Sequence, residues 1–313
     1  MSLFLITLIA VAVLLLVAVP GYVLVKRKMI SEDCISGFSK VLLYVCQPCL
    51  AVYTFMDLPL SRENLINVGI FAALSVLVHA IMLGVSFLVL FKKSKQPIYR
   101  IITLATTFAN CAFFGIPIIE ALMPEAAPSL IVYTTVYAVV MNLIGWTVGS
   151  AIISHDRKYI TVKQIFLNPT MLGIVLALIV YLFDINFPDT VSSVIQCTAR
   201  MATPLSMIIM GMRLATMKLR DMFVDYRIYL TVAVKQFIMP LMAFGVVMLF
   251  DGVSVDLRKT LFIICACPIA SVVLNFSEII GEGQKSAANL VLVSTILSIA
   301  TLPLMMLLLP LII

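Results

Sequence analysis

The sequence predicts an all-α polytopic membrane protein with ten transmembrane helices. Of the 313 residues, 63% are hydrophobic and only 12% are charged, whereas an ordinary soluble domain is about half apolar and roughly a quarter charged. The mean hydropathy is +1.16, and the apolar stretches reach the roughly 20 residues that a helix needs to cross the hydrocarbon layer. This composition excludes a DNA-binding protein, a secreted disulfide scaffold and a cytosolic enzyme.

Ten apolar segments follow one another along the chain, separated by short loops. The first has no positive charge before it and no small-residue cleavage site, so we interpret it as a retained span rather than a signal peptide. The segments cover about residues 3–25, 36–56, 64–91, 98–122, 127–153, 165–183, 190–213, 228–250, 257–280 and 287–311.

The distribution of Lys and Arg predicts the topology. Fourteen of the 21 lie in odd-numbered loops, and only Arg62, Arg258 and Lys259 lie in even-numbered ones. Because cytoplasmic loops carry the excess of positive charge, we expect both termini to face the outside of the cytoplasmic (inner) membrane. The net charge of +6 therefore belongs to the loops, and we expect no nucleic-acid partner.

The ten segments divide into two sets of five, and landmarks recur in both. The pairs Asn110 with Pro268 and Glu120 with Glu278 share a sequence offset of 158 residues. Because five is odd, the second set must enter the membrane inverted. The remaining landmarks are Gln47-Pro48 and Thr203-Pro204 in segments 2 and 7, and Gly115-Ile116-Pro117 and Asn275 in segments 4 and 9.

We therefore predict inverted five-helix repeats at residues 1–153 and 165–313, joined by a cytoplasmic linker at 154–164. Proline inside a span frees backbone groups, and lipid tolerates such groups only where they face protein or line a cavity. Inverted repeats with broken helices in matching positions are typical of secondary transporters with a site near the midplane. The alternative is that these prolines are simple kinks.

Four stretches resemble the auxin efflux carrier family, which includes the plant PIN-formed proteins and many bacterial relatives. The resemblance runs through the whole chain in order. Its motifs are Gly21-Tyr22 with Lys26-Arg27-Lys28-Met29-Ile30-Ser31, Asn110 with Gly115-Ile116-Pro117, Ala202-Thr203-Pro204-Leu205 with Gly211 and Leu214-Ala215, and Cys267-Pro268 with Ser294-Thr295, Ser298 and Thr301-Leu302-Pro303-Leu304.

The resemblance implies a fold similar to the sodium/proton antiporter NhaA and to the bile acid transporters, within the bile/arsenite/riboflavin transporter superfamily. It also implies an elevator-type exchange of access and a crossover of two prolines, for which Pro117 and Pro268 fit. The plant members have a long loop between spans 5 and 6. Here that loop is only about residues 154–164, as in bacterial members.

Asn110 is the first candidate for substrate binding, because an amide supplies donors and an acceptor and helix N-termini favour anions. The alternative for Asn110 is an inter-helix hydrogen bond, which contributes only about 0.6 kcal/mol. The other expected substrate-binding residues lie around the two breaks and are Gly115, Pro117, Pro268, Ser271 and Asn275.

Charged residues inside spans are costly and usually functional. Arg200 and Lys235 either attract an anion or pair with carboxylates, whereas Lys40 and Arg213 near span ends are expected to snorkel. His79 is expected to form a packing hydrogen bond rather than to carry protons. The titratable candidates for proton or sodium coupling are Glu278, Asp57 and His79.

The sequence thus predicts a secondary transporter that moves a small organic anion by an elevator-type mechanism. Family members handle auxin-like acids or carboxylates such as malonate and malate. The alternatives are a sodium-coupled bile-acid-type symporter and a membrane ligand sensor. We expect no enzyme, cofactor or metal site, because no nucleophile–base pair or metal cluster is found. A homodimer is expected by analogy with relatives of this fold.

Overall fold

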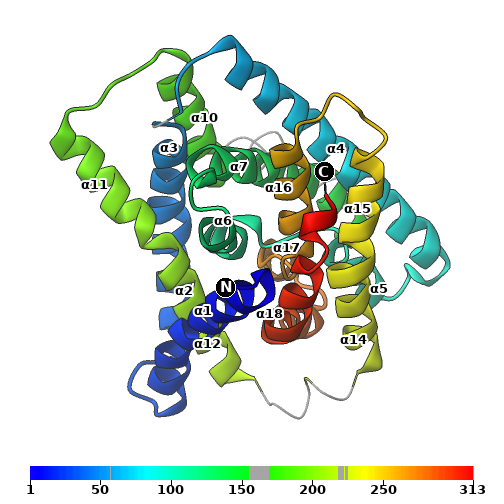
Figure 1. The fold of residues 1–313 in the computed structure, drawn as a ribbon. Helices are drawn as coiled ribbons and strands as arrows, with labels where there is room; N and C mark the ends of the chain where they lie inside the picture. Colours follow the sequence, from blue (N-terminus) through cyan, green and yellow to red (C-terminus); the bar gives the residue numbers. More distant parts are fainter. Residues whose placement is uncertain (57, 155–168, 218–221, 223–224, 313) are drawn as a thin grey trace.

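The computed structural model describes residues 1–56, 58–154, 169–217, 222 and 225–312. These residues form helices and connecting turns, with one isolated β-bridge between Ala109 and Ile269. Each of the ten predicted segments contains helix in its described part, and the helices surround two short linkers that meet in the middle of the molecule (Figure 1). The observed helix ends lie within a few residues of the predicted ones.

The first five segments form one run of helices, three of which include a π-helical turn. The elements are α1 (Leu3–Lys26), α2 (Cys34–Val41), η1 (Leu42–Cys46), α3 (Gln47–Met56), α4 (Arg62–Leu90), η2 (Phe91–Lys93), α5 (Pro97–Ala105), η3 (Cys111–Gly115), α6 (Ile116–Leu122), α7 (Ala127–Ile144), η4 (Gly145–Gly149) and α8 (Ser150–Ser154).

The last five segments form the second run of helices. The elements are α10 (Pro169–Leu182), α11 (Asp189–Arg200), α12 (Ala202–Thr216), α14 (Tyr226–Ala233), η6 (Val234–Ile238), α15 (Met239–Val247), α16 (Val255–Ala266), α17 (Val272–Ile280), α18 (Gln284–Met306) and η7 (Leu309–Leu311). The expected linker at 154–164 lies outside the described residues except for Ser154.

Proline accounts for three of the π-helical turns. The turns η1, η3 and η6 each end two residues before a proline, namely Pro48, Pro117 and Pro240. A proline has no N–H for the helical ladder, and its ring collides with the carbonyl four residues earlier. A widened turn makes room for the ring without ending the helix.

Six helices are long and apolar enough to cross a membrane, so the chain is a polytopic membrane protein. They are Leu3–Lys26, Cys34–Met56, Arg62–Lys93, Ala127–Ser154, Tyr226–Val247 and Gln284–Leu311. The other four predicted segments fall short of this length in the described residues. Three of them are divided in two, as α5 and α6, α11 and α12, and α16 and α17, and α10 is described only from residue 169.

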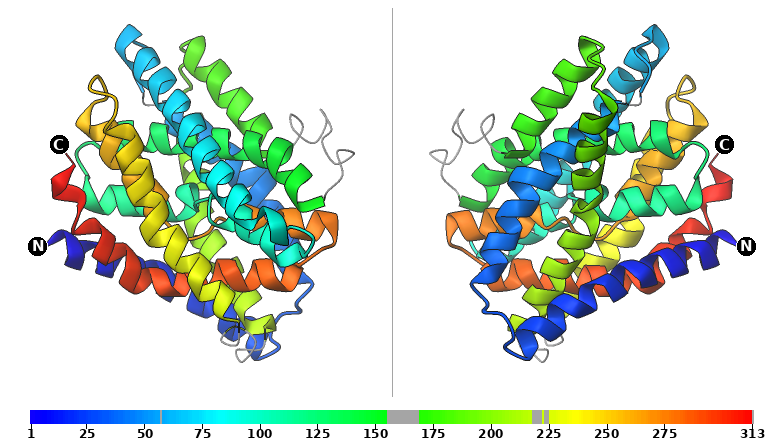
Figure 2. Two further views of the ribbon diagram at one scale, coloured as in Figure 1. Left: turned by 90° about the vertical axis from the view of Figure 1, so that its right-hand side faces the viewer. Right: turned by 90° about the vertical axis from the view of Figure 1, so that its left-hand side faces the viewer.

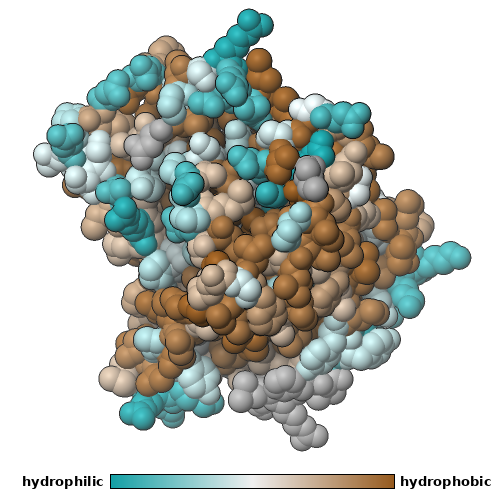
Figure 3. Space-filling model, in the orientation of Figure 1, coloured by the Kyte–Doolittle hydropathy of each residue, from teal (hydrophilic) through white to brown (hydrophobic). Residues whose placement is uncertain are grey.

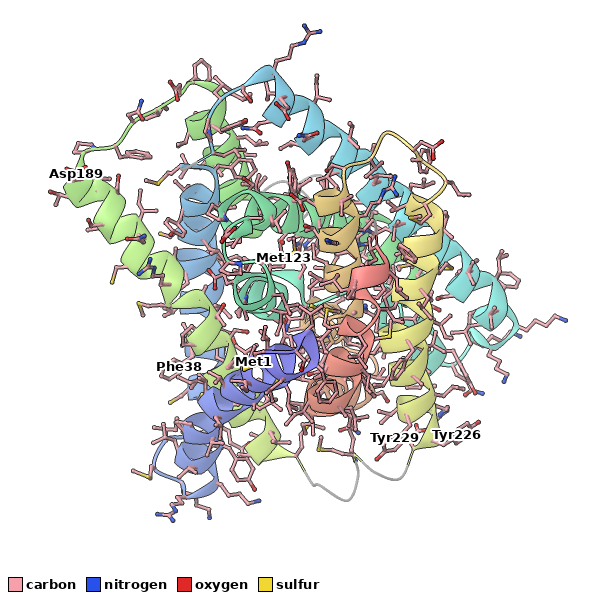
Figure 4. All side chains as sticks on the ribbon, viewed as in Figure 1. Met1, Phe38, Met123, Asp189, Tyr226 and Tyr229 are labelled. Carbon is pink, nitrogen blue, oxygen red and sulfur yellow. The ribbon has the colours of Figure 1, made fainter. Side chains whose placement is uncertain are left out.

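The surface fits a lipid environment. The N- and C-termini lie at the same edge of the molecule (Figure 2), as an even number of crossings requires. Apolar residues cover the middle of the face over α1, α15 and α18, with hydrophilic residues along its margins (Figure 3). Tyr226 and Tyr229 lie at the start of α14 near the lower margin (Figure 4), where the amphipathic ring of tyrosine suits a membrane–water interface.

The helices pack as two groups. In the first group, α1 packs along α12, and α3 packs against α10 and α11. In the second group, α4 packs on α5 and α7, α6 on α7, α15 on α16, and α18 on both α14 and α17. We call these the first and second helix groups. They meet where α1 contacts α6 and α18.

Glycine allows α1 and α12 to touch backbone to backbone. A Cβ atom added at Gly21 would lie 2.1 Å from the carbonyl oxygen of Ile208, and one at Gly211 would lie 1.8 Å from that of Ala18. Close approach through small residues is a main source of helix association in lipid, where no hydrophobic driving force acts between helices. The first helix group therefore depends on these two positions.

We predict that Gly211→Ala lowers the thermal midpoint in detergent, because overpacking of this kind costs about 1–3 kcal/mol. The matched control is Gly245→Ala in α15, where an added Cβ meets nothing within 4 Å and the better helix propensity of Ala should hold or raise the midpoint. Equal midpoints for the two variants would show that the α1–α12 contact does not depend on glycine.

Candidate functional site at the helix crossover

Two helices are broken at the centre of the second helix group. Helix α5 ends at Ala105, and the chain continues without regular helix to Asn110 before η3 and α6 begin. Helix α16 ends at Ala266, and Cys267 is extended (φ −60°, ψ 154°). The extended conformation follows from Pro268, because proline disfavours the α-region for the residue before it.

The two linkers cross and satisfy each other's backbone groups. The amide N–H of Asn110 donates to the carbonyl of Pro268 at 2.8 Å, and that of Ala270 donates to the carbonyl of Phe108 at 3.0 Å. These two bonds flank the antiparallel bridge between Ala109 and Ile269. We call this arrangement the crossover.

The crossover joins the two halves of the chain. Asn110 and Pro268, which share the offset of 158 in sequence, are hydrogen-bond partners, and the bridge itself pairs Ala109 with Ile269. Pro117 lies in the first turn of α6, seven residues beyond Asn110, and takes no part in the bridge.

Side chains of η6 and α18 brace the second linker. The N–H of Ile269 donates to Ser294 Oγ at 3.0 Å, and Gln236 Nε2 donates to the Ser294 carbonyl at 2.9 Å. Lys235 Nζ donates to the carbonyl of Cys265 at 2.6 Å. Ser294, Gln236 and Lys235 are all fully buried. The crossover is thus held both by its own backbone and by neighbouring helices.

A cavity of about 100 Å³ lies beside the crossover and between the two helix groups. Its lining residues carry amide, hydroxyl and apolar groups, and none of them is charged. We call it the crossover cavity, and it is lined by Leu43, Gln47, Ala109, Asn110, Cys111, Ala112, Phe113, Ala138, Met141, Asn142, Trp146, Ala270, Ser271, Val272 and Asn275.

Two of the amides in this cavity have polar atoms without a partner. Asn110 is 4% exposed, and its Nδ2 forms no hydrogen bond with the described part of the chain; the same holds for Gln47 Oε1. Buried polar groups are normally paired. One unpaired donor and one unpaired acceptor at the same cavity are suited to a small polar ligand.

Two further cavities extend from this region. One of about 60 Å³ shares Leu43, Phe113, Ser271 and Asn275 with the crossover cavity. The other, of about 310 Å³, lies toward the opposite end of α6 and α7, where its lining includes Glu120 and Arg200. The crossover therefore separates two hollow regions, both lined by residues of the two helix groups.

The structure brings together three of the predicted substrate-binding residues, Asn110, Ser271 and Asn275. Pro268 contributes its carbonyl to the crossover instead. Gly115 donates its N–H to the Asn110 carbonyl at 3.1 Å and lies behind the cavity. Pro117 lines the 310 Å³ cavity rather than the crossover cavity.

Sequence reasoning missed Gln47, Asn142 and Trp146 as lining residues. Gln47 stood out only as the neighbour of Pro48. Asn142 donates to the carbonyl of Ala138 at 2.8 Å on its own helix, and a mid-helix amide carries no motif. An amide inside an apolar segment was the available signal for both.

The predicted charged and titratable residues lie in several different parts of the structure. His79 is fully buried, with Nδ1 2.7 Å from the Ser75 carbonyl and its ring 4.5 Å from that of Tyr137. Glu278 forms an ion pair at 2.6 Å with Arg213, which therefore does not simply snorkel. Arg200 is exposed at the 310 Å³ cavity. Asp57 lies outside the described residues.

Within the described ranges, no group of three or more His, Cys, Asp or Glu side chains could hold a metal ion. The chemistry available at the crossover is therefore that of amides, hydroxyls and backbone groups. Such groups can bind and orient a small solute.

We predict that Ser294→Ala lowers the thermal midpoint, because the buried N–H of Ile269 loses its acceptor, at a cost of about 1–3 kcal/mol. The matched control is Ser298→Ala on the same helix, whose hydroxyl is equally buried but donates only to the Thr295 carbonyl at 2.6 Å. A midpoint for Ser294→Ala no lower than that of the control would mean that Ser294 does not brace the crossover.

Comparison with known proteins agrees with this arrangement. The sequence model of a family described as membrane transport protein matches residues 6–166 and 158–306. No curated protein matches the chain. The family match covers both halves and nearly the whole length, and the family consists of transporters rather than enzymes. The chain belongs to the membrane transport protein family, which is the auxin efflux carrier family.

Proposed function

We propose that this protein is a secondary transporter that moves a small organic anion, a carboxylate, across the cytoplasmic membrane by an elevator-type alternating-access mechanism. The observation that carries the proposal is the hydrogen-bonded crossover of two broken helices beside a cavity lined by amides. Broken helices that cross near the midplane are the recurring site architecture of secondary transporters.

Two helix beginnings offer hydrogen-bond donors for an anionic substrate. The helical segment Cys111–Leu122 and helix α17 both start at the crossover, and the first amides of a helix have no partner within it. The aligned peptide dipoles add roughly half a positive charge at each such end. Asn110 adds a side-chain donor at the same place. A carboxylate would accept from these groups.

The cavity positions support an elevator movement. The crossover cavity takes Gln47 from the first helix group and Asn110, Asn142 and Asn275 from the second. The 310 Å³ cavity lies between the same two groups, farther along α6. If the second group slides against the first, a ligand at the crossover is exposed first to one hollow region and then to the other.

An ion pair joins the two groups in this conformation. Arg213 of α12 and Glu278 of α17 are 2.6 Å apart, with side chains 26% and 42% exposed. Exposed pairs contribute only about 0–1 kcal/mol, so this contact can break in every cycle. Glu120 and Arg200 line the other cavity, and we propose that they pair in the opposite conformation.

The proposal includes the inverted repeat. Residues 1–153 and 165–313 form the two five-helix units of an NhaA-like fold, with residues 154–164 as the cytoplasmic linker. The excess of Lys and Arg in odd-numbered loops and the shared edge of the termini support both termini facing outside.

Proton or sodium coupling stays part of the proposal. His79 and Glu278 are the described titratable candidates, but Glu278 already has a partner in Arg213. A sodium-coupled symporter of the bile acid type is the alternative, and sodium-dependent uptake would distinguish it. Malonate and malate represent the carboxylates to test first.

We predict saturable counterflow of one acid from a panel of labelled small carboxylates in sealed proteoliposomes. Asn110→Ala and Gln47→Ala should each reduce it at least 10-fold, because each removes an unpaired polar group from a residue that lines the cavity. The control is Asn64→Ala, whose amide donates to the Pro59 carbonyl away from the cavity. Full counterflow in both cavity variants would refute the site, and no counterflow of any acid would refute the anion proposal.

We also predict that Arg213→Gln and Glu278→Gln change the counterflow rate by a similar factor, because both remove the same contact between the helix groups. The exchanged pair, Arg213→Glu with Glu278→Arg, should restore most of the original rate. If the exchanged pair is no better than the single variants, the ion pair does not hold the conformation.

A further inference from the structure

Lys235 is a buried lysine that has no acidic partner in the described part of the chain. Its side chain is fully buried in η6, and its one hydrogen bond runs from Nζ to the Cys265 carbonyl at 2.6 Å. None of the ion pairs in the described part of the chain includes Lys235. An unpaired charge is costly to bury, and inside a membrane such a residue usually has a function.

The ammonium stands at the C-terminal end of α16. Cys265 is the residue before Ala266, with which α16 ends, and the last carbonyls of a helix lack intrahelical partners. This end of a helix carries roughly half a negative charge. The Cys265 carbonyl is only three residues before that of Pro268, which holds the Asn110 N–H. Lys235 therefore lies where α16 meets the second linker of the crossover.

The crossover alone has no preferred sign of charge. Two helices, α5 and α16, end there with negative poles, and two others begin there with positive poles. Because each pole amounts to roughly half a charge, the four nearly cancel. The side chains that line the crossover cavity are all uncharged. Selectivity for anions therefore needs a charge from outside the lining.

The surroundings of Lys235 supply no counter-charge. The groups that interact with it electrostatically are His79 of α4 and the thiols of Cys111, Cys265 and Cys267. His79 bonds to its own helix through Ser75 and packs against the rings of Tyr137 and Phe108. Of the two helices that end at the crossover, α16 is the one with the ammonium group of Lys235 beside it. This positive charge adds to the four helix poles, which otherwise nearly cancel, and makes their sum positive.

We infer that Lys235 is the residue that makes the crossover cavity selective for anions. Its ammonium neutralises the negative pole of α16 and leaves the two helix beginnings to act on the ligand. Lys235 does not line the cavity, so it acts at a distance, through the field and through the position of the second linker. This inference rests on the proposed function and names the residue that sets the charge of its substrate.

The test compares a carboxylate with its uncharged amide in the same protein. Binding is measured by thermal shift for propionate with propionamide, malonate with malonamide, and benzoate with benzamide. Lys235→Gln removes the charge but keeps a donor for the Cys265 carbonyl, which guards against misfolding. Lys235→Met removes both the charge and the donor. For the acid that binds the unaltered protein, both variants should weaken binding at least 10-fold, while binding of its amide changes less than twofold.

Two further variants separate charge from structure. Lys235→Arg keeps the positive charge and should retain most of the preference for the acid over the amide. Gln236→Met removes the neighbouring brace on Ser294 without removing a charge, and it should affect the acid and the amide equally.

The inference is overturned if Lys235→Gln weakens the acid and the amide by the same factor, because Lys235 would then be only a structural brace. It is also overturned if neither substitution changes binding of the acid. Failure of the proposed function has a different result: in that case none of the three acids stabilises the unaltered protein, or only the amides do.

Discussion

Backbone hydrogen bonding inside a membrane is the constraint on which the structure depends. Where α5 and α16 stop, amides and carbonyls are released in a region without bulk water, and an unpaired backbone group there costs several kcal/mol. The two linkers pair with each other, through Asn110 with Pro268 and Ala270 with Phe108. The backbone groups of each break therefore find their hydrogen-bond partners in the other break. These bonds join the two halves of the chain.

The same pairing produces the site. Because the linkers cross, the helical segment Cys111–Leu122 and α17 begin next to each other, beside the cavity of Gln47, Asn110 and Asn275. Helices η6 and α18 brace only the second linker, through Lys235, Gln236 and Ser294. The arrangement is thus nearly symmetric in its backbone and asymmetric in its charge. That asymmetry is our physical explanation for the anion preference that we propose.

Much of the fold could be predicted from composition, because membrane helices must be apolar over a fixed length. The break at Pro268 could also be predicted, because this proline interrupts an apolar segment. The first break lies at residues 106–110 and not at Pro117, the proline for which the sequence predicted it. Gln47 and Asn142 were missed because they carry no motif, and the Arg213–Glu278 pair joins residues 65 positions apart, which only tertiary packing brings together.

The central claim is that the ligand occupies the cavity at the crossover. Ala112 lines that cavity and is half-buried, so a cysteine placed there reports on occupancy. In a protein whose seven native cysteines are replaced by alanine, the alkylation rate of Ala112→Cys should be measured with and without the transported carboxylate. We predict that a saturating concentration slows alkylation at least 10-fold. An unchanged rate at a concentration that saturates transport would contradict a binding site at the crossover.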